Sequence, residues 1–351
     1  MEEVTFHLQT ITPLFMAGAD QTTAELRAPS FRGEMRYWQR ALIGGIVGTN
    51  AVGLKQVVTQ ETKIFGATDT GSAVIMHISA PSHGPVEFTE PISKRVGNTW
   101  QATGKGYLLW SMAESGRVDK GNYKPARWYF PPGTKFQVTL SVQDQHEMRL
   151  KQAVACFWLL TQLGAVGSRS RRCAGSLEVE DAHATKTDLL QKISIESFRG
   201  ANSIQQLQNQ IKDGIKIARD LFIPELSPIQ VSQANFDVVA PQVCRIWILH
   251  NNGRAWNGLN ETMTAIGQDL QAYRSGITPL GRRKVFGLPL KNVSGSRRAS
   301  PLLLRVAKLQ GGQYVGMAVL FKTTGGGVGP GDYKLIEDWI DAFPGRSEVK
   351  L

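Results

Sequence analysis

Hydrophobic and polar residues alternate at the start of the chain. In VTFHLQT, residues 4–10, apolar and polar side chains take turns, and this period of two predicts a strand with one buried face. After a loop rich in Gly, Ala, Thr and Pro, apolar residues recur every three or four positions from Phe31 to Leu42, which predicts a helix. We expect Ser30 to cap this helix and the glycine pair at 44–45 to end it.

The same patterns predict the other elements of the first half. They are a helix over Leu54–Ile64, strands over Ala73–Ala80 and Lys135–Val142, a helix over Glu147–Leu163 and a strand in LEVE, residues 177–180. Residues 81–132 contain Pro, Gly and aromatic residues without a clear period, and we interpret them as an insertion. Strand, helix, strand, strand, helix, strand is the order of a ferredoxin-like fold.

The second half resembles the first in the order of its elements, without a detectable sequence repeat. The expected elements are a strand over Val243–Leu249, a helix over Leu259–Tyr273, a hairpin of Leu302–Leu309 with Tyr314–Phe321, and a helix over Tyr333–Phe343. A polar, Gln-rich stretch with one amphipathic helix, Ile204–Leu221, precedes them. We therefore predict an α+β protein with two ferredoxin-like (RRM-like) domains, 1–184 and 234–351, joined by a helical connector, 185–233.

Composition places the chain among globular proteins with a polyanionic partner. Of its 351 residues, 42% are hydrophobic and 20% charged, and the formal net charge is +11. Three widely spaced cysteines exclude a disulfide framework and a CxxC site. The first residues do not resemble a signal peptide, and the longest apolar run, 153–163, is too short for a membrane helix. We expect a cytoplasmic protein without membrane contact.

Basic residues gather in three short clusters. They are Arg27 with the helical ridge Arg32, Arg36 and Arg40; the loop residues Gly167, Ser168, Arg169, Ser170, Arg171 and Arg172; and Arg282, Arg283, Lys284, Arg297 and Arg298. Glycines let backbone amides approach phosphates, and arginine forks bind phosphate oxygens, so all three are candidate RNA-binding sites. The alternative for the ridge is a solvated helix face, although only Glu34 lies nearby as a counter-charge. The second cluster could instead be a flexible basic loop, and the third could dock on an acidic protein surface.

Aromatic residues of the insertion add a stacking option. Trp100, Tyr107, Trp110, Trp128 and Tyr129 could stack on the bases of a single strand. Packing of the insertion onto the core is the alternative for each of them.

The sequence contains no recognisable catalytic, metal or cofactor motif. Six scattered histidines form no HxH or HExxH pattern, and neither GTNAVG nor TTGGGVGPG continues as a P-loop. We expect no metal site, no cofactor and no catalytic residue. Asp20 is the acid to test for metal-free RNA cleavage, and a turn-forming aspartate is its alternative interpretation.

Several sequence blocks resemble one known family. TPLFMAGAD, AELRAPSFRGEMRYWQRAL, KIFGAT, LGAVGSRSRRCAGS and RRASPLLLRVAKL resemble the RAMP superfamily of repeat-associated mysterious proteins. More narrowly, they resemble its first-numbered subunits in type III-B CRISPR effectors, the Cmr complexes. The family's RNA-facing positions correspond to Arg27, Arg32, Arg36, Arg40, Arg169, Arg171 and Arg172. Cys173 and Ala174 depart from the Gly and aromatic residue that usually follow.

This resemblance implies two ferredoxin-like domains and a noncatalytic role in an antiviral ribonucleoprotein. The expected partners are the CRISPR guide RNA, especially its 3′ region, the target single-stranded RNA and other RAMP subunits. A metal-independent endoribonuclease of the same superfamily, processing CRISPR repeat RNA, is the alternative function.

Overall fold

The first antiparallel sheet consists of four strands from the first half of the chain. The structure is a computed structural model that describes residues 1–191, 193–290, 293–324 and 328–351. Strands β1 (Glu2–Thr10), β2 (Ile75–Ile78), β7 (Lys135–Val142) and β8 (Leu177–Ala184) lie in the order β2-β7-β1-β8. Helices α1 (Ala28–Val47), α2 (Ala51–Phe65) and α4 (Glu147–Leu163) complete this half. This strand order is that of a ferredoxin-like fold.

A second antiparallel sheet repeats the arrangement. Strands β9 (Cys244–Leu249), β12 (Leu302–Lys308), β13 (Tyr314–Phe321) and β14 (Arg346–Val349) lie in the order β12-β13-β9-β14, with helices α7 (Leu259–Gly276) and α8 (Lys334–Ala342). The corresponding strands occupy the same places in both sheets. The duplicated ferredoxin-like architecture is therefore confirmed, and its last strand, the polar β14, is the element that the sequence did not predict.

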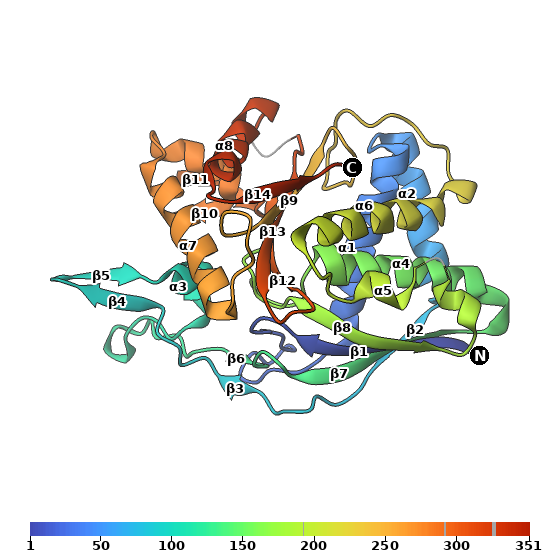
Figure 1. Cartoon of the computed structure of the whole chain (residues 1–351), viewed down its shortest axis with the longest axis horizontal. Coiled ribbons are helices and arrows are strands. Elements are labelled where there is room, and N and C mark those ends of the chain that lie inside the picture. Colours follow the sequence, from blue (N-terminus) through green and yellow to red (C-terminus); the bar gives the residue numbers. More distant parts are fainter. Residues whose placement is uncertain (192, 291–292, 325–327) are drawn as a thin grey trace.

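The two sheets differ in how they are covered. Helices α1, α4 and α6 (Ile204–Asp220) lie between them, and the first sheet forms the lower layer in Figure 1. Its outer face is open, which explains why buried and half-buried residues alternate along β1. The second sheet packs one face against these helices through Ile246 and Phe321, and the other against α7 and α8 through Trp247 and Leu320. Burial on both faces explains the apolar run of β13 and that of β12, which only Arg305 interrupts.

One hydrophobic core contains residues from both halves of the chain. Trp38 of α1, for example, lies with its ring centroid 6.1 Å from that of Phe321 of β13. The boundaries at 184 and 234 stay predictions. No helix in the described parts of the chain is long and apolar enough to cross a membrane.

The insertion forms an arm made of short elements. Strand β3 (Val86–Glu87) pairs with β6 (Trp128–Tyr129), β4 (Ser93–Val96) pairs with β5 (Thr99–Ala102), and helix α3 (Gly104–Leu109) follows the hairpin. Figure 1 shows the β4–β5 hairpin projecting away from both sheets. The base of the arm is fixed where α3 packs closely against α7. Gly104 permits this close approach, since a Cβ at this position would lie only 2.0 Å from Thr264 O. Elements of two to six residues are too short to show a period, so the sequence predicted only a loop-like segment.

Helix α1 is longer at both ends than predicted. It begins at Ala28 rather than Ser30, with Pro29 in its first turn, where the missing proline N–H is not needed. It continues through the glycine pair at 44–45 to Val47, and Gly48 ends it with a φ of 79°. A Cβ on Gly45 would lie 2.1 Å from Val239 O. The glycines therefore permit close packing and do not stop the helix.

The remaining elements are short or connect the two halves. They are α5 (Ile195–Phe198), β10 (Leu288–Leu290), β11 (Val293–Arg298) and the 3-10 turns Trp110–Met112, Val118–Lys120, Asp144–His146, Thr187–Leu190, Ile223–Glu225, Leu280–Phe286 and Pro330–Tyr333.

Candidate functional site

The glycine–arginine loop, residues 164–176, is held against the edge of the second sheet. Cys173 N donates a hydrogen bond to Leu304 O at 2.8 Å, and Leu304 N donates to Arg171 O at 3.3 Å. Arg169 and Cys173 adopt left-handed backbone conformations, with φ values of 62° and 65°, which non-glycine residues rarely do. The loop is therefore built into the contact between the two halves of the chain, in contrast to the alternative of a flexible basic loop.

Arg172 is buried and fully engaged with backbone and hydroxyl groups. Its Nη1 donates to Leu302 O at 3.1 Å, and its Nη2 donates to Phe286 O and Ser300 Oγ, both at 3.1 Å. Burial lowers the pKa of Arg172 to about 9, so it stays charged at neutral pH. Its guanidinium links the loop to the second sheet, a structural role that the sequence does not reveal.

A second buried arginine, Arg305, joins the same contact. It donates to Thr161 O, near the carboxyl end of α4, and to Leu177 O at 3.3 Å. Burial lowers the pKa of Arg305 to about 9. A cation at the carboxyl end of a helix satisfies free carbonyls and complements the helix dipole. It lies inside an apolar strand, where sequence patterns give no signal for it.

Arg169 and Arg171 are positioned by different partners. Arg169 Nε donates to Leu108 O at 2.8 Å, and burial lowers the pKa of Arg169. Arg171 Nη2 donates to Asp237 Oδ2 at 2.9 Å, and Arg171 Nη1 donates to Ser300 O at 2.6 Å. Both guanidiniums are therefore held in fixed orientations beside the surface.

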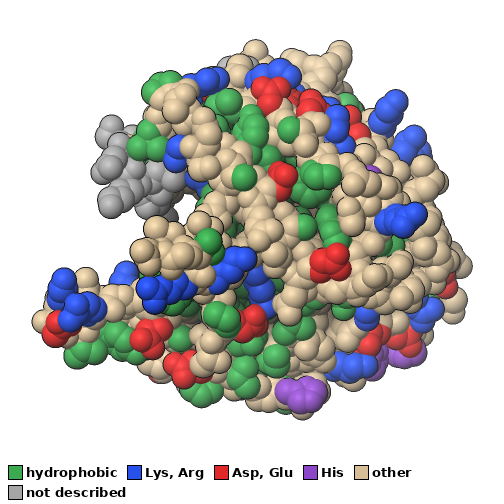
Figure 2. All heavy atoms as spheres, turned by 60° about the vertical axis from the view of Figure 1, so that its left-hand side comes forward, with side chains coloured by type: hydrophobic (Ala, Val, Ile, Leu, Met, Phe, Trp, Pro, Cys, Tyr) green, Lys and Arg blue, Asp and Glu red, His purple; other side chains and the backbone are tan. Residues whose placement is uncertain are grey.

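Two adjoining hollows of about 730 and 430 Å³ form one groove beside this loop. Both are lined by Arg171, Arg298, Ala299 and Ser300, so they adjoin at these residues. The described lining includes six arginines and a single acidic residue, Asp237: the arginines are Arg40, Arg169, Arg171, Arg172, Arg274 and Arg298. Figure 2 shows a notch above the arm, with Lys and Arg side chains along its lower wall. We call these two hollows the arginine groove.

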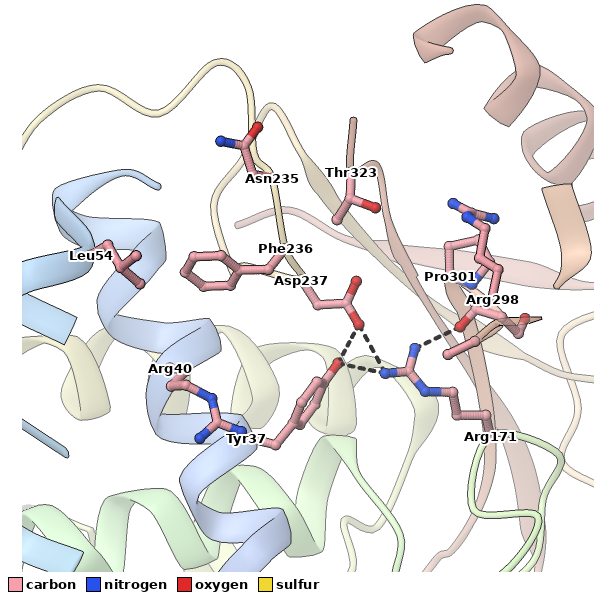
Figure 3. A pocket seen from close by; sticks show the side chains of 12 residues that line it. Tyr37, Arg40, Leu54, Arg171, Asn235, Phe236, Asp237, Arg298, Pro301 and Thr323 are labelled. Carbon is pink, nitrogen blue, oxygen red and sulfur yellow. Dashed lines mark hydrogen bonds and ion pairs between the residues drawn. The ribbon is translucent and has the colours of Figure 1, made fainter. Parts of the chain in front are cut away.

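The smaller hollow combines cationic and aromatic walls. Figure 3 shows Tyr37, Asp237 and Arg171 joined by hydrogen bonds, with Arg40 on one side and Arg298 on the other. Tyr37 Oη donates to Asp237 Oδ2 at 2.8 Å. Burial, with the nearby Asp237 carboxylate, raises the pKa of Tyr37 well above its ordinary value. The phenol therefore stays neutral and acts as a hydrogen-bond donor.

The helical ridge contributes only Arg40 to the described lining. Arg36 and Arg40 both form ion pairs with Glu61 of α2, at 2.6 and 2.9 Å. The sequence showed only Glu34 as a counter-charge within the same helix, and the structure adds Glu61 from the neighbouring helix. Arg27 pairs with Glu25 at 2.8 Å, and Arg32 makes no hydrogen bond or ion pair with the described residues.

The third cluster is divided in space. Arg298 lines both hollows and donates to Tyr333 Oη at 2.8 Å. Arg283 donates to Ser275 O at 2.7 Å, away from the described lining. Arg282 is exposed and Lys284 is half-buried, also outside that lining. The side chain of Arg297 lies outside the described residues.

Other predicted residues are likewise separated by the fold. Ser168 and Ser170 line the larger hollow, whereas Gly167 does not. Among the five aromatic candidates, Trp110 is 58% exposed and lines the groove together with Tyr107. Trp100 and Trp128 are exposed on the arm, and Tyr129 is buried against Phe15.

Arg274, Asn235 and Asp237 belong to the groove but were not predicted. Arg274, in the last turn of α7, donates to Tyr107 Oη and lies over Phe286, 5.1 Å from its ring centroid. In the sequence it is a single cation near a helix end, and Asn235 and Asp237 lie in an irregular segment. No sequence signal distinguishes them from ordinary surface residues.

The structure gives Asp20 a turn-forming role. Its carboxylate accepts hydrogen bonds from Thr22 N and Thr22 Oγ1, both at 2.9 Å, and these bonds lower the pKa of Asp20. A base with a lowered pKa is poorly matched to proton abstraction near neutral pH. Among the described residues, no group of three or more His, Cys, Asp or Glu side chains could hold a metal ion.

Comparison with known proteins identifies the family. Residues 7–178 match the RAMP superfamily. The chain is 37% identical over 186 residues to the CRISPR system Cmr subunit Cmr1-2 of Pyrococcus furiosus. The aligned region covers 51% of this chain and 96% of that protein. This chain belongs to the RAMP superfamily. This RAMP protein is also 26% identical over 307 residues to Cmr1-1 of the same organism, 86% of this chain and 81% of that protein. The resemblance stated from the sequence blocks is thus confirmed, including its narrower match to first-numbered Cmr subunits.

Solved structures confirm the fold of this RAMP protein over almost its whole length. The crystal structure of Cmr1 from Pyrococcus furiosus, apo form, matches with a TM-score of 0.67 at 22% identity, covering 99% of both chains. A chain in the cryo-EM structure of the type III-B Cmr-beta bound to cognate target RNA matches with a TM-score of 0.59 at 13% identity, covering 97% of this chain and 99% of that chain. These likenesses support two ferredoxin-like domains.

Proposed function

We propose that this RAMP protein is a noncatalytic, cytoplasmic subunit of a type III-B CRISPR effector ribonucleoprotein. It binds guide or target single-stranded RNA in the arginine groove, beside other RAMP subunits, in antiviral defence. The observation that carries this proposal is the groove itself, whose described lining contains six arginines, Arg172 buried in the wall among them, and one carboxylate. Its relatives are named as Cmr subunits, and one structurally similar chain comes from a complex bound to target RNA.

The chemistry of the groove suits a polynucleotide backbone. Arginine guanidiniums bind phosphate oxygens through paired hydrogen bonds, and phosphate neutralisation dominates affinity for RNA. The hydroxyl groups of Ser168 and Ser170 add neutral donors along the same wall. Trp110 offers an exposed ring on which a base can stack. Such contacts position the strand, and base pairing between guide and target supplies sequence specificity.

The proposed RNA-binding residues differ from those that the sequence clusters suggested. Arg40, Arg169, Arg171, Arg274 and Arg298 are the proposed phosphate-binding residues. Arg172 supports the groove wall from behind, because its side chain is buried and is held by four hydrogen bonds to the protein.

Fluorescence anisotropy with a labelled single-stranded RNA tests the groove. Arg298→Gln should weaken binding and flatten the log–log salt dependence by about 0.7 for each phosphate that the variant no longer neutralises. Trp110→Ala should weaken binding by about 1–3 kcal/mol while leaving that slope unchanged, since stacking releases no counterions. Arg117→Gln is the matched control, because Arg117 is 67% exposed and lies in the arm, outside the described groove lining. If all three variants bind like the parent protein, the groove is not the RNA site.

The noncatalytic part of the proposal has its own test. Purified protein in EDTA should leave CRISPR repeat RNA intact. A defined cut under these conditions would contradict the proposal and favour a metal-independent endoribonuclease.

A further inference from the structure

Four large aliphatic side chains are exposed along the first half of α2 and beside it. On the helix, Val52 is 71% exposed, Leu54 47% and Val58 56%. Ile229 is 51% exposed, and its N–H donates to Ile46 O at 2.8 Å, which places it at the α1–α2 corner. Single exposed aliphatic residues are ordinary, but several of them close together are typical of an interaction surface. We call these four residues the α2 face.

The charges around the α2 face are one-sided. Lys55 is exposed between Val52 and Val58 along the helix. The acidic residues near this helix are already engaged: Glu61 pairs with Arg36 and Arg40, and Glu225 pairs with Lys63 and Arg149. A complementary surface therefore combines apolar side chains with a carboxylate that can reach Lys55.

The side-chain types of the α2 face favour a protein over RNA as its occupant. Valine, leucine and isoleucine have no π-face on which a base can stack, whereas bound single strands rely on aromatic rings and arginine. Leu54 and Val58 lie one helical turn apart. A pair of aliphatic side chains with this spacing is typical of a surface against which another helix packs.

The α2 face is also continuous with the arginine groove. Leu54 lines the smaller hollow opposite Arg298 and Pro301. A strand that follows the groove to this end leaves it beside α2. A protein bound to the next nucleotides of the same strand would therefore lie next to the α2 face.

We propose that the α2 face docks an amphipathic, acidic segment of a neighbouring protein subunit. Its apolar side chains cover Val52 and Val58, and its carboxylate pairs with Lys55. The inference rests on the proposed role as a subunit of an assembly, but it does not require RNA to occupy the arginine groove.

Site-specific photocrosslinking in the complex purified from its native host tests this contact. A benzophenone amino acid at position 58 should crosslink to one other protein chain, at a segment where apolar residues adjoin Asp or Glu. The matched control is position 118 on the arm, where Val118 is 76% exposed, and it should not reach that segment. Crosslinks from position 58 to RNA, to a second copy of this chain or to nothing would overturn the inference.

Charge substitutions test whether the contact holds the complex together. Val52→Glu combined with Val58→Glu should reduce retention of the crosslinked subunit by about tenfold, which corresponds to about 1.4 kcal/mol. Lys55→Glu should also reduce it, whereas Val118→Glu should not. RNA affinity and melting temperature of the isolated variants should match those of the parent protein. If the double variant retains the crosslinked subunit normally, only the docking proposal for the α2 face is contradicted. If the parent protein copurifies with no other Cmr subunit, the proposed function itself is contradicted.

Discussion

Arg171 Nη2 lies 2.9 Å from Asp237 Oδ2, the same oxygen that accepts a hydrogen bond from Tyr37 Oη. This contact joins the glycine–arginine loop, the irregular segment before the second sheet and helix α1. It also places the single acidic residue of the described lining directly against one of the proposed phosphate-binding residues. Asp237 therefore holds Arg171 in position and competes with RNA for it.

Asp237→Asn should tighten binding of single-stranded RNA. The amide keeps an acceptor for Tyr37 but removes a negative charge from the groove. One unit charge at about 4 Å in a water-like dielectric contributes about 1 kcal/mol, or roughly fivefold in affinity. Fluorescence anisotropy measures the change, and thermal melting reports any loss of stability. Weaker binding by a variant with unchanged melting would show that Asp237 acts mainly by orienting Arg171.

Arg172→Met should destabilise the protein strongly. The substitution fills much of the volume but removes four described hydrogen bonds. Phe286 O loses its described donor, whereas Leu302 O and Ser300 Oγ still bond to each other's residue. One unpaired buried acceptor typically costs 1–3 kcal/mol and each further lost hydrogen bond about 1 kcal/mol, so we expect a loss of about 3 kcal/mol or more in the free energy of unfolding. Chemical denaturation measures it. Arg282→Met, at an exposed position, is the control, and equal stability of the two variants would refute the structural role of Arg172.

Two glycines of α1 should respond in opposite ways to alanine. A Cβ on Gly45 would lie 2.1 Å from Val239 O, so Gly45→Ala should lower the free energy of unfolding by about 2 kcal/mol. A Cβ on Gly33 would meet nothing within 4 Å, so Gly33→Ala should raise it by about 0.5–1 kcal/mol through helix propensity. Urea denaturation of both variants measures the contrast. A stabilised Gly45→Ala variant would mean that the helix and residue 239 can separate without penalty.

Long periodic segments made most of the fold predictable. Lys135–Val142, Glu147–Leu163 and Tyr314–Phe321 have the predicted boundaries because their hydrophobic patterns are unbroken. Strand β14, with sequence RSEV, is a short polar edge strand whose pairing with β9 depends on tertiary contacts. The glycine pair in α1 misled the prediction because it allows close packing against Val239, which lies almost 200 residues away in the sequence.

The site was only partly predictable, because sequence proximity does not determine which side of a loop a side chain occupies. Arg171 and Arg172 are adjacent, yet one lines the groove beside Asp237 and the other is buried behind it. Arg298 and Arg274 reach the same hollow from separate elements. A cluster of arginines in a sequence therefore identifies a region, and only the fold separates residues that face a ligand from those that hold the wall.

Glu225 should make stability depend on pH in the acid range. Its carboxylate accepts hydrogen bonds from Arg149 Nη1 at 2.6 Å, Lys63 Nζ at 2.7 Å and Gln152 Nε2 at 3.1 Å, thereby joining α2, α4 and the turn at 223–225. The Arg149 hydrogen bond, with those of Lys63 and Gln152, lowers the pKa of Glu225 to about 2. A lowered pKa means that this stabilisation is fully present above the ordinary glutamate pKa of about 4.3 and is lost as the pH falls toward 2.

Glu225→Gln should therefore reduce the melting temperature at neutral pH, and the difference from the parent protein should shrink between about pH 4.5 and pH 2. The amide keeps the shape of the side chain but cannot form the ion pairs with Arg149 and Lys63. Differential scanning calorimetry across this range measures the difference, and Asp213→Asn, at an exposed position in α6, controls for the loss of one carboxylate. A difference that stays constant down to pH 2 would show that the charge of Glu225 contributes nothing to the packing of α2 against α4.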